Sequence, residues 1–181
     1  MLAAVVGLSA SATEITPESG DWSGSRSLGA DDILVLDVSE GSTKAYSGSI
    51  TGSGKVRKIG CGILQLTGDN SGFSGEWLVT TGRVEVTTTA NLGSGSVKVW
   101  AEPNKYTGTL YFGCSSAQTF ANPIKIMGPG AGYTLSGGSV DAYRQIHAKI
   151  SGGKQGSVVD VTLSGEITAE EGCARFWVSS V

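Results

Sequence analysis

The most constraining feature of this sequence is a run of very short apolar pairs, each followed by a glycine-bearing turn, between residues 49 and 99. Within each pair one polar residue separates two apolar ones, as in Leu64 and Leu66 or Val84 and Val86. Alternation over three or four residues is typical of a half-buried β-strand. Strands this short and turns this frequent predict a chain that coils repeatedly around a narrow core, which is a β-solenoid.

The same alternation assigns a core face to most of the chain. Residues 33–38 form the first strong strand, and Gly82 is expected where a turn needs a positive φ. The side chains predicted to point into the core are Leu34, Leu36, Val38, Val56, Leu64, Leu66, Val79, Val84, Val86, Val97 and Val99. Further strands are predicted at residues 109–112, 123–127, 133–135, 146–150, 158–163 and 176–178. At about 20–25 residues per turn, residues 33–181 would make about six or seven turns.

The composition supports an ordered all-β chain. Glycine makes up 28 of the 181 residues, about twice the usual 7%, which suits a chain that turns often. Proline occurs only 4 times, so the glycines do not belong to a disordered Pro/Gly-rich tract. The hydrophobic fraction of 39% and the charged fraction of 16% also argue against disorder, which requires few apolar residues and much charge.

The chain divides into three segments by composition. Residues 1–12 are small and apolar and end in Ala-Ser-Ala, which resembles the apolar region and cleavage site of a secretory signal. An N-terminal strand is the alternative. Residues 13–32 are polar and acidic and predict an N-terminal cap, with Trp22 packed on the first turn. Residues 33–181 are expected to form one solenoid domain. No apolar run of about eighteen residues occurs, so no transmembrane helix is predicted in this chain.

The charge pattern says little about partners but disfavours nucleic acid. The formal net charge is -3, and residues 1–54 hold seven acidic residues against two basic ones. No cluster of lysines and arginines interleaved with aromatic residues occurs, as a nucleic-acid-binding surface would need.

The three cysteines, Cys61, Cys114 and Cys173, lie far apart and form neither a CxxC motif nor a Cys/His zinc pattern. The favoured interpretation is small buried hydrophobic residues inside the solenoid. One disulfide with one free thiol is the alternative.

A search for catalytic chemistry finds one mixed cluster, Asp141 with Arg144 and His147. Polysaccharide cleavage needs two or three converging carboxylates, or a carboxylate beside a basic group. A solvated strand edge is the favoured interpretation of this cluster. His147 is the only histidine, which excludes a multi-histidine metal site, and residues 136–141 lack the spacing of a calcium-binding nonapeptide. We therefore predict no catalytic, cofactor-binding or metal-ligating residue.

Aromatic residues supply the only candidate contact surface. The candidate surface-contact residues are Trp77, Trp100 and Tyr106, followed in the sequence by Tyr111 and Phe112. An exposed aromatic strip would suit contact with a glycan or a protein. Packing of these rings at corners and over turns is the favoured interpretation.

Residues 45–86 read AYSGSITGSGKVRKIGCGILQLTGDNSGFSGEWLVTTGRVEV, and residues 90–99 continue as ANLGSGSVKV. This stretch resembles the autotransporter-associated β-strand repeat, also called the passenger-associated transport repeat. The matching positions are Tyr46, Ser47, Gly48, Ile50, Gly52, Ser53, Gly54, Lys58, Gly60, Gly62, Leu64, Leu66, Thr67, Gly68, Asn70, Phe73, Ser74, Gly75, Val79, Gly82, Val84 and Val86. At position 77 the family prefers Thr, whereas this chain has Trp77.

The resemblance implies a right-handed parallel β-helix and a secreted or cell-surface passenger segment. We therefore expect a non-enzymatic rigid stalk or surface-contact module without a cofactor. Its expected partners are a host or matrix glycan or protein, or a second copy bound through exposed end turns. A carbohydrate-active β-helix enzyme and a self-associating fibre element are the alternatives. The strand predicted at Phe176–Val178 has no cap beyond it, so we expect association through that edge or continuation of the solenoid in a longer chain.

Overall fold

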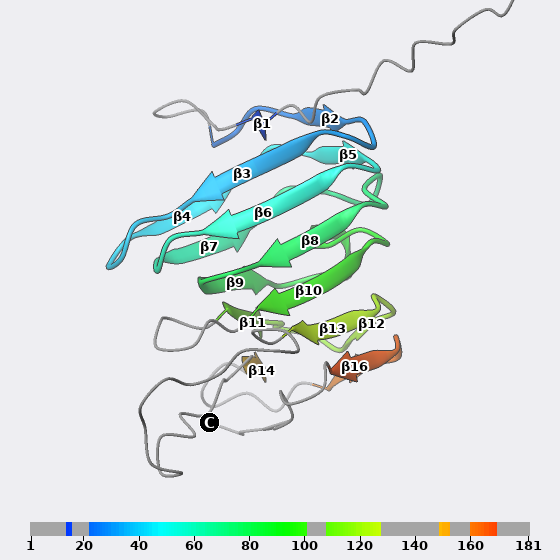
Figure 1. Ribbon diagram of the computed structural model, residues 1–181. Coiled ribbons are helices and arrows are strands. Elements are labelled where there is room, and N and C mark those ends of the chain that lie inside the picture. The colour runs from blue at the N-terminus through cyan, green and yellow to red at the C-terminus, as the bar shows by residue number, and fades with distance from the viewer. Residues whose placement is uncertain (1–13, 16–21, 101–107, 128–148, 153–159, 170–181) are drawn as a thin grey trace, which may run out of the picture.

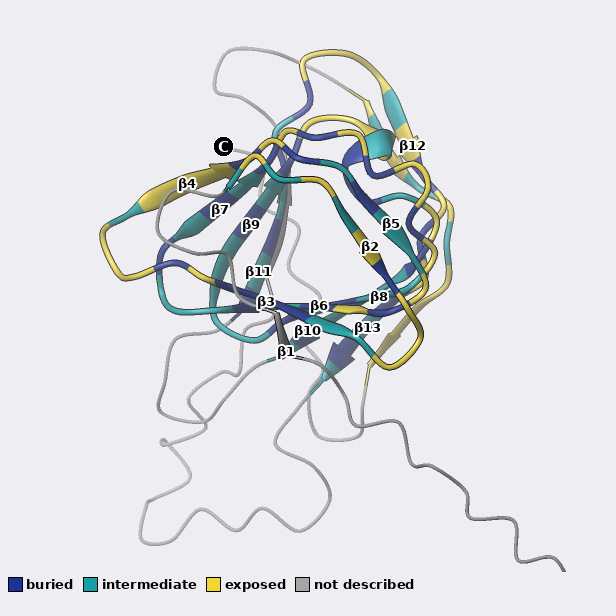
Figure 2. Ribbon diagram, turned by 90° about the horizontal axis from the view of Figure 1, so that it is seen from above, coloured by how far each residue is buried: buried dark blue, intermediate teal, exposed yellow. Residues whose placement is uncertain are grey.

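Parallel strands wind around a single core and form three faces (Figures 1 and 2). The computed structural model describes residues 14–15, 22–100, 108–127, 149–152 and 160–169. In this part of the chain the strands stack as a β-solenoid of about four turns, and the one helical element is a short 3-10 helix. The predicted all-β solenoid is confirmed.

The first face is a seven-stranded sheet, and the second is a five-stranded sheet. In spatial order the seven-stranded sheet contains β1 (Glu14–Ile15), β3 (Ile33–Asp37), β6 (Lys55–Ile59), β8 (Glu76–Val79), β10 (Ser96–Trp100), β13 (Ile124–Met127) and β16 (Ile167–Ala169). The five-stranded sheet contains β14 (Lys149–Gly152), β11 (Gly108–Phe112), β9 (Gly82–Val86), β7 (Ile63–Leu66) and β4 (Thr43–Tyr46). The third face contains the pairs β2 (Arg26–Leu28) with β5 (Ile50–Gly52) and β12 (Gln118–Phe120) with β15 (Val161–Leu163), and the 3-10 helix η1 (Thr89–Asn91), which contacts β12.

The strand register brings equivalent positions of successive turns into one column. Val56 pairs with Trp77, Trp77 with Val97, and Val97 with Ile124, all in parallel strands. Neighbouring strands of a sheet lie about 4.8 Å apart, so these side chains stack directly on one another. Seen from the N-terminal end, the chain passes clockwise from face to face as it moves away from the viewer, which makes the coil right-handed (Figure 2).

The length of each turn is not constant. Ile33 pairs with Lys55, 22 residues later, and the next two partners, Glu76 and Ser96, follow after 21 and 20 residues. The step from Val97 to Ile124 takes 27 residues, and the step from Ile124 to Ile167 takes 43. The prediction of six or seven turns was therefore too high, because it assumed that every turn has the length of the regular repeat.

The core is formed by the side chains that the alternating pattern assigned to it. All of the predicted core residues are buried, and each has at most 1% of its surface exposed. Close backbone packing continues between the strands, since a Cβ atom on Gly95 would collide with the carbonyl oxygen of Gly75, and one on Gly75 with that of Gly54. Glycine is required in this column because successive turns touch backbone to backbone.

Most predicted strands that fall in the described residues are present. Strands β11, β13 and β15 correspond to the predictions at residues 109–112, 123–127 and 158–163, and β14 overlaps the one at 146–150. Strands β12 and β16 were not predicted. Residues 1–12, 133–135 and 176–178 lie outside the described residues.

The predicted cap, residues 13–32, contributes strands rather than only irregular chain. Strand β1 extends the seven-stranded sheet, and β2 pairs with β5 on the third face. The indole of Trp22 packs on the core and meets the ring of Tyr46 edge-on, with 6.5 Å between the ring centroids. Among the described residues no strand lies above β4 in the five-stranded sheet. The cap therefore covers two faces of the first turn and leaves the third face of the stack, at β4, exposed.

Candidate functional site

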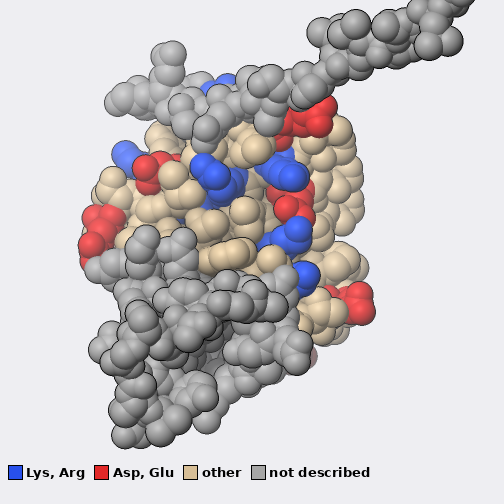
Figure 3. Space-filling view, viewed as in Figure 1, with Lys and Arg blue, Asp and Glu red and all other residues tan. Residues whose placement is uncertain are grey.

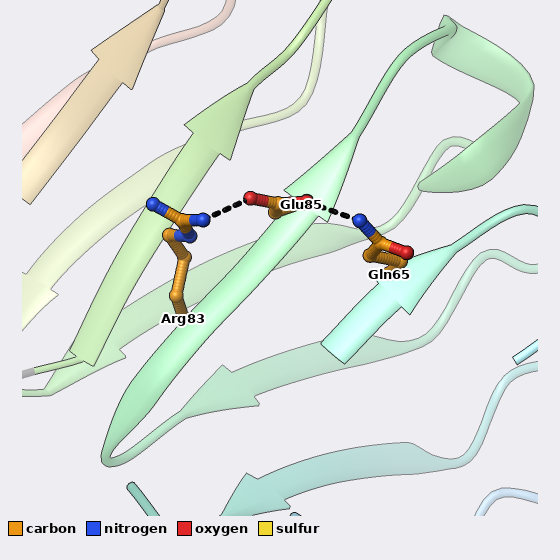
Figure 4. A network of polar contacts seen from close by, with 3 residues as sticks. All are labelled: Gln65, Arg83 and Glu85. Atoms are coloured by element: carbon orange, nitrogen blue, oxygen red, sulfur yellow. Dashed lines mark hydrogen bonds and ion pairs between the residues drawn. The ribbon is translucent and has the colours of Figure 1, made fainter. Parts of the chain in front are cut away.

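A network of polar side chains crosses the outer face of the five-stranded sheet (Figure 4). Glu85 receives a hydrogen bond from Gln65 Nε2 on one side, at 2.8 Å, and an ion pair from Arg83 on the other. Gln65 and Glu85 occupy paired positions on β7 and β9, so the contact follows directly from the strand register. Both oxygens of the Glu85 carboxylate are therefore engaged by neighbouring side chains.

Arg83 extends the same network to the next turn. Its guanidinium lies 5.0 Å from the centroid of the Tyr111 ring, a cation–π contact. The network thus joins β7, β9 and β11 across three successive turns. With its carboxylate fully engaged, it stabilises the outer surface and leaves no general base poised for proton transfer at this position.

Lys58 is the one charged side chain of the described residues that lies in the core. It sits on the inward face of β6, between Leu36 and Val79 in register, and is 1% exposed. Its ammonium group donates hydrogen bonds to the carbonyl oxygens of Ile59 at 2.7 Å and Gly60 at 2.6 Å. A third hydrogen bond, of 3.2 Å, reaches the Thr81 carbonyl one turn further along.

Burial lowers the pKa of Lys58 from 10.5 to about 8 because the ammonium form is desolvated. The neighbouring Asp37 and, to a smaller extent, Cys61 act in the opposite direction and favour the charged form. An amine of this kind could serve as a nucleophile if a substrate reached it. Lys58 is enclosed by backbone carbonyls, however, so the geometry supports a structural role that closes the corner between β6 and β7.

A second buried polar group lies at the corner that precedes each strand of the seven-stranded sheet. Asn70 accepts a hydrogen bond from the backbone N–H of Ile50 at 2.7 Å and donates one to the carbonyl of Asn91 at 2.7 Å. Asn91 in turn donates to the carbonyl of Gly68 at 3.0 Å. Asn122, one turn beyond, donates to the carbonyl of Gly95 at 2.7 Å. Buried amides therefore tie each corner to the turns next to it.

The structure corrects the assignment of Trp77 as a surface-contact residue. Its side chain is 1% exposed, stacks between Val56 and Val97, and donates its indole N–H to the Leu92 carbonyl at 2.9 Å. The ring also meets Phe73 edge-on at 5.3 Å. Position 77 faces the core because it has the same parity as Val79 on one strand, so Trp cannot reach the surface there.

The other aromatic candidates have different positions. Trp100 is half-buried at the end of β10, on the outer face of the seven-stranded sheet. Tyr111 is half-buried and lies beneath Arg83, whereas Phe112 is buried and packs against Phe120. Tyr106 lies outside the described residues. The continuous aromatic strip considered from the sequence is therefore not formed by Trp77 and Phe112.

Both cysteines of the described residues are free thiols. Cys114 is fully buried in the core, as predicted, and burial raises the pKa of its thiol. Cys61 is half-buried in the turn beside Lys58. Cys173 lies outside the described residues.

The described residues contain no group of three or more His, Cys, Asp or Glu side chains placed to hold a metal ion. The mixed cluster of Asp141, Arg144 and His147 lies outside them, as do residues 136–141. Within the same part of the chain, no helix has the length and apolar character needed to cross a membrane. Comparison with known proteins adds no relative: no family model, curated protein or solved structure matches this chain.

Two features of the site could have been found from the sequence. Lys58 follows Val56 by two residues, so the strand alternation already places it on the core face. Arg83 and Glu85 share the outer face of one strand for the same reason. The partners Asn91 and Tyr111 could not have been assigned, because their positions depend on the length of the turn that separates them from Asn70 and Arg83.

Proposed function

We propose that this chain is a non-enzymatic, exported structural segment of the autotransporter-passenger type, which acts as a rigid stalk with flat faces for surface contact. The observation that supports the proposal most directly is the bonding between turns. Strands pair in parallel on three faces, and buried side chains add hydrogen bonds at the corners, so that each turn is joined to its neighbours all around its perimeter.

Rigidity follows from this arrangement. A solenoid bends where neighbouring turns separate, and separation here would break ladder hydrogen bonds and would also expose the carbonyls held by Lys58 and Asn122. Each buried polar group left without a partner costs about 1–3 kcal/mol. The apolar column through Val56, Trp77 and Val97 would open at the same time. A short rod of this kind is suited to hold a surface at a fixed distance.

Export is tested in the native host. Antibodies raised against the folded chain should label intact cells, and protease added to intact cells should remove that signal while a cytosolic marker protein survives. Labelling that appears only after the cells are lysed would overturn the exported stalk.

A carbohydrate-active β-helix enzyme is the second candidate, and it would depend on Asp141 and His147. Incubation of the protein with pectin, polygalacturonate and bacterial glycans is expected to release no reducing ends. Release that Asp141→Asn or His147→Ala abolishes, while Asp69→Asn leaves it unchanged, would establish the enzyme instead. Asp69 serves as the control because it is an exposed carboxylate on a different corner.

A further inference from the structure

We propose that the outer face of the seven-stranded sheet binds an acidic polysaccharide through its carboxylate groups. The proposal rests on the surface-contact role given above and names the partner of that surface. The binding surface, called here the basic face, consists of the outward side chains of β6, β8, β10 and β13. It is the face turned toward the viewer in Figures 1 and 3.

The strand register places the cations of the basic face in rows along the stack. Arg57 pairs with Leu78, Leu78 with Lys98, and Lys98 with Lys125, so these four side chains form one outward row across four turns. Lys55 begins the neighbouring row. Adjacent strands are about 4.8 Å apart, which sets a regular spacing for charges along the row.

The basic face is positive although the chain as a whole is negative. Its four strands present Lys55, Arg57, Lys98 and Lys125 outward, against Glu76 alone. Four cations and one carboxylate leave a surplus of three positive charges, whereas the whole chain has a formal net charge of -3. Figure 3 shows lysine and arginine side chains following one another down this face. Local charge of one sign attracts a ligand of the other sign even on a protein of opposite net charge.

Stability alone does not explain the arrangement. Like charges directly opposite each other on neighbouring strands are destabilising, and Lys98 lies directly opposite Lys125. Glu76 offsets part of this repulsion through an ion pair with Lys98 at 2.6 Å, but both partners are partly exposed, with 34% and 23% of their side chains accessible. A partner with several negative charges would relieve the repulsion along the whole row.

An apolar row runs beside the cations and indicates which polyanion is bound. Trp100 pairs with Met127 at the ends of β10 and β13, and both side chains are half-buried with their outer surfaces accessible. Sugar rings have apolar C–H faces that pack on such side chains, whereas their carboxylates can pair with lysine and arginine. A flat sheet face suits an extended polymer chain that lies along it.

Other polyanions fit this face less well. A nucleic acid has a much higher charge density, and the acidic remainder of the chain, with its pI near 5.1, would repel it. An anionic membrane would favour apolar side chains that project from the surface, and Trp100 and Met127 are half-buried. The basic face is therefore assigned to an acidic glycan.

The test is an equilibrium binding measurement with the whole chain, using fluorescence anisotropy of a labelled oligogalacturonate. Its methyl ester, which has no charge, serves as the ligand control. The double variant Lys98→Gln/Lys125→Gln removes two cations from the row, and Lys44→Gln/Arg83→Gln removes the same charge from elsewhere on the molecule. Lys125→Gln alone is measured as well, so that the test does not depend on the stability of the double variant.

Oligogalacturonate is expected to bind with an affinity that falls as salt is added, and its methyl ester is expected not to bind. The Lys98/Lys125 variant should weaken binding about tenfold, since each cation lost at a polyanionic surface contributes about 1 kcal/mol. The Lys44/Arg83 variant should bind nearly as the parent does. No binding at low salt, equal weakening by the two variants, or tighter binding to an oligonucleotide or to anionic vesicles would each overturn the proposal. Surface labelling of cells is independent of this result, so the stalk function could stand if the glycan proposal failed.

Discussion

Asn70 donates a hydrogen bond from its side-chain amide to the backbone carbonyl of Asn91, over a distance of 2.7 Å. Both residues are buried, and they belong to successive turns of the solenoid. Because Asn70 also accepts from the N–H of Ile50, its amide connects three turns at one corner. No apolar side chain could satisfy both of these backbone groups.

We therefore expect Asn70→Leu to destabilise the protein strongly. The substitution leaves the Ile50 N–H and the Asn91 carbonyl buried without partners, at about 1–3 kcal/mol each. Urea unfolding followed by circular dichroism should show a loss of about 2–5 kcal/mol in the free energy of unfolding. Ser53→Ala, at an exposed position of the same face, should change it by less than about 0.5 kcal/mol. Similar losses for the two variants would contradict the role assigned to Asn70.

The direction of side chains on β7 gives a second prediction. Leu66 is 1% exposed and points into the core, whereas Gln65 points outward. Leu66→Asp should prevent folding, because it buries a charge without a partner. Gln65→Thr should change the free energy of unfolding by less than about 1 kcal/mol. Aspartate is avoided at position 65 because it would lie opposite Glu85 and add like-charge repulsion. Circular dichroism and denaturant titration compare the two variants, and equal damage would show that the register is wrong.

Three glycines separate the effect of backbone conformation from the effect of space. Gly29→Ala should be nearly neutral, because φ is ordinary there and the added Cβ would meet nothing closer than 3.4 Å. Gly41 has φ +72 with open space around it, so Gly41→Ala should cost about 1 kcal/mol from backbone strain alone. Gly82 has φ +69 and would also bring Cβ against the Gly62 and Gly60 carbonyls, so its substitution should cost more than the other two. Thermal unfolding ranks the variants, and any other order would contradict this explanation.

Lys58 predicts a specific dependence of stability on pH. The folded protein releases the Lys58 proton near pH 8, whereas the unfolded chain keeps it until about pH 10.5. Between these values the unfolded state binds more protons, so the free energy of unfolding should rise with pH. Below pH 8 the residue is protonated in both states and contributes no slope. Unfolding of the parent and of Lys58→Met, measured from pH 7 to about pH 10.5, isolates the contribution as the difference. A difference that stays flat or falls over this range would disprove the lowered pKa.

Lys44 protects the exposed edge of the five-stranded sheet. Among the described residues, β4 is the end strand of this sheet, and Thr43, Lys44 and Ala45 are exposed. Lys44 has the inward parity of its partner Leu64, and an inward-pointing charge on an edge strand opposes the addition of another chain. Lys44→Val should therefore promote association, seen as a molecular mass in light scattering that grows with concentration. Lys55→Val, on the inner strand β6, is the control. A monomeric Lys44→Val variant would show that the edge is protected in another way.

Residue alternation predicted the core of this protein well, because one inward side chain in every two follows from strand geometry alone. Leu64, Leu66, Val84 and Val86 are buried as expected. The same rule places Trp77 inside, two residues before Val79, and the contrary suggestion of a surface aromatic came from residue type instead of position. Lys58 illustrates the reverse case, in which a charged residue occupies an inward position because backbone carbonyls accept its protons.

Contacts between turns could not be predicted to the same extent, because they depend on how many residues each turn contains. The pairing of Arg83 with Tyr111 spans a turn whose length departs from the regular repeat. Strand β16 lies against β13 although 43 residues separate Ile124 from Ile167. No local pattern records such a distance, so neither the number of turns nor the outer-face neighbours follow from the sequence.

The unequal turn lengths also imply an order of folding. Each new strand finds its partner by closing a loop of one turn, and the entropy lost in closing a loop grows with its length. The loop from Ile33 to Lys55 has 22 residues, and the loop from Ile124 to Ile167 is about twice as long, which adds about 0.6 kcal/mol to its closure. The three compact turns from β3 to β10 should therefore form first and provide a template, and β16 should dock last.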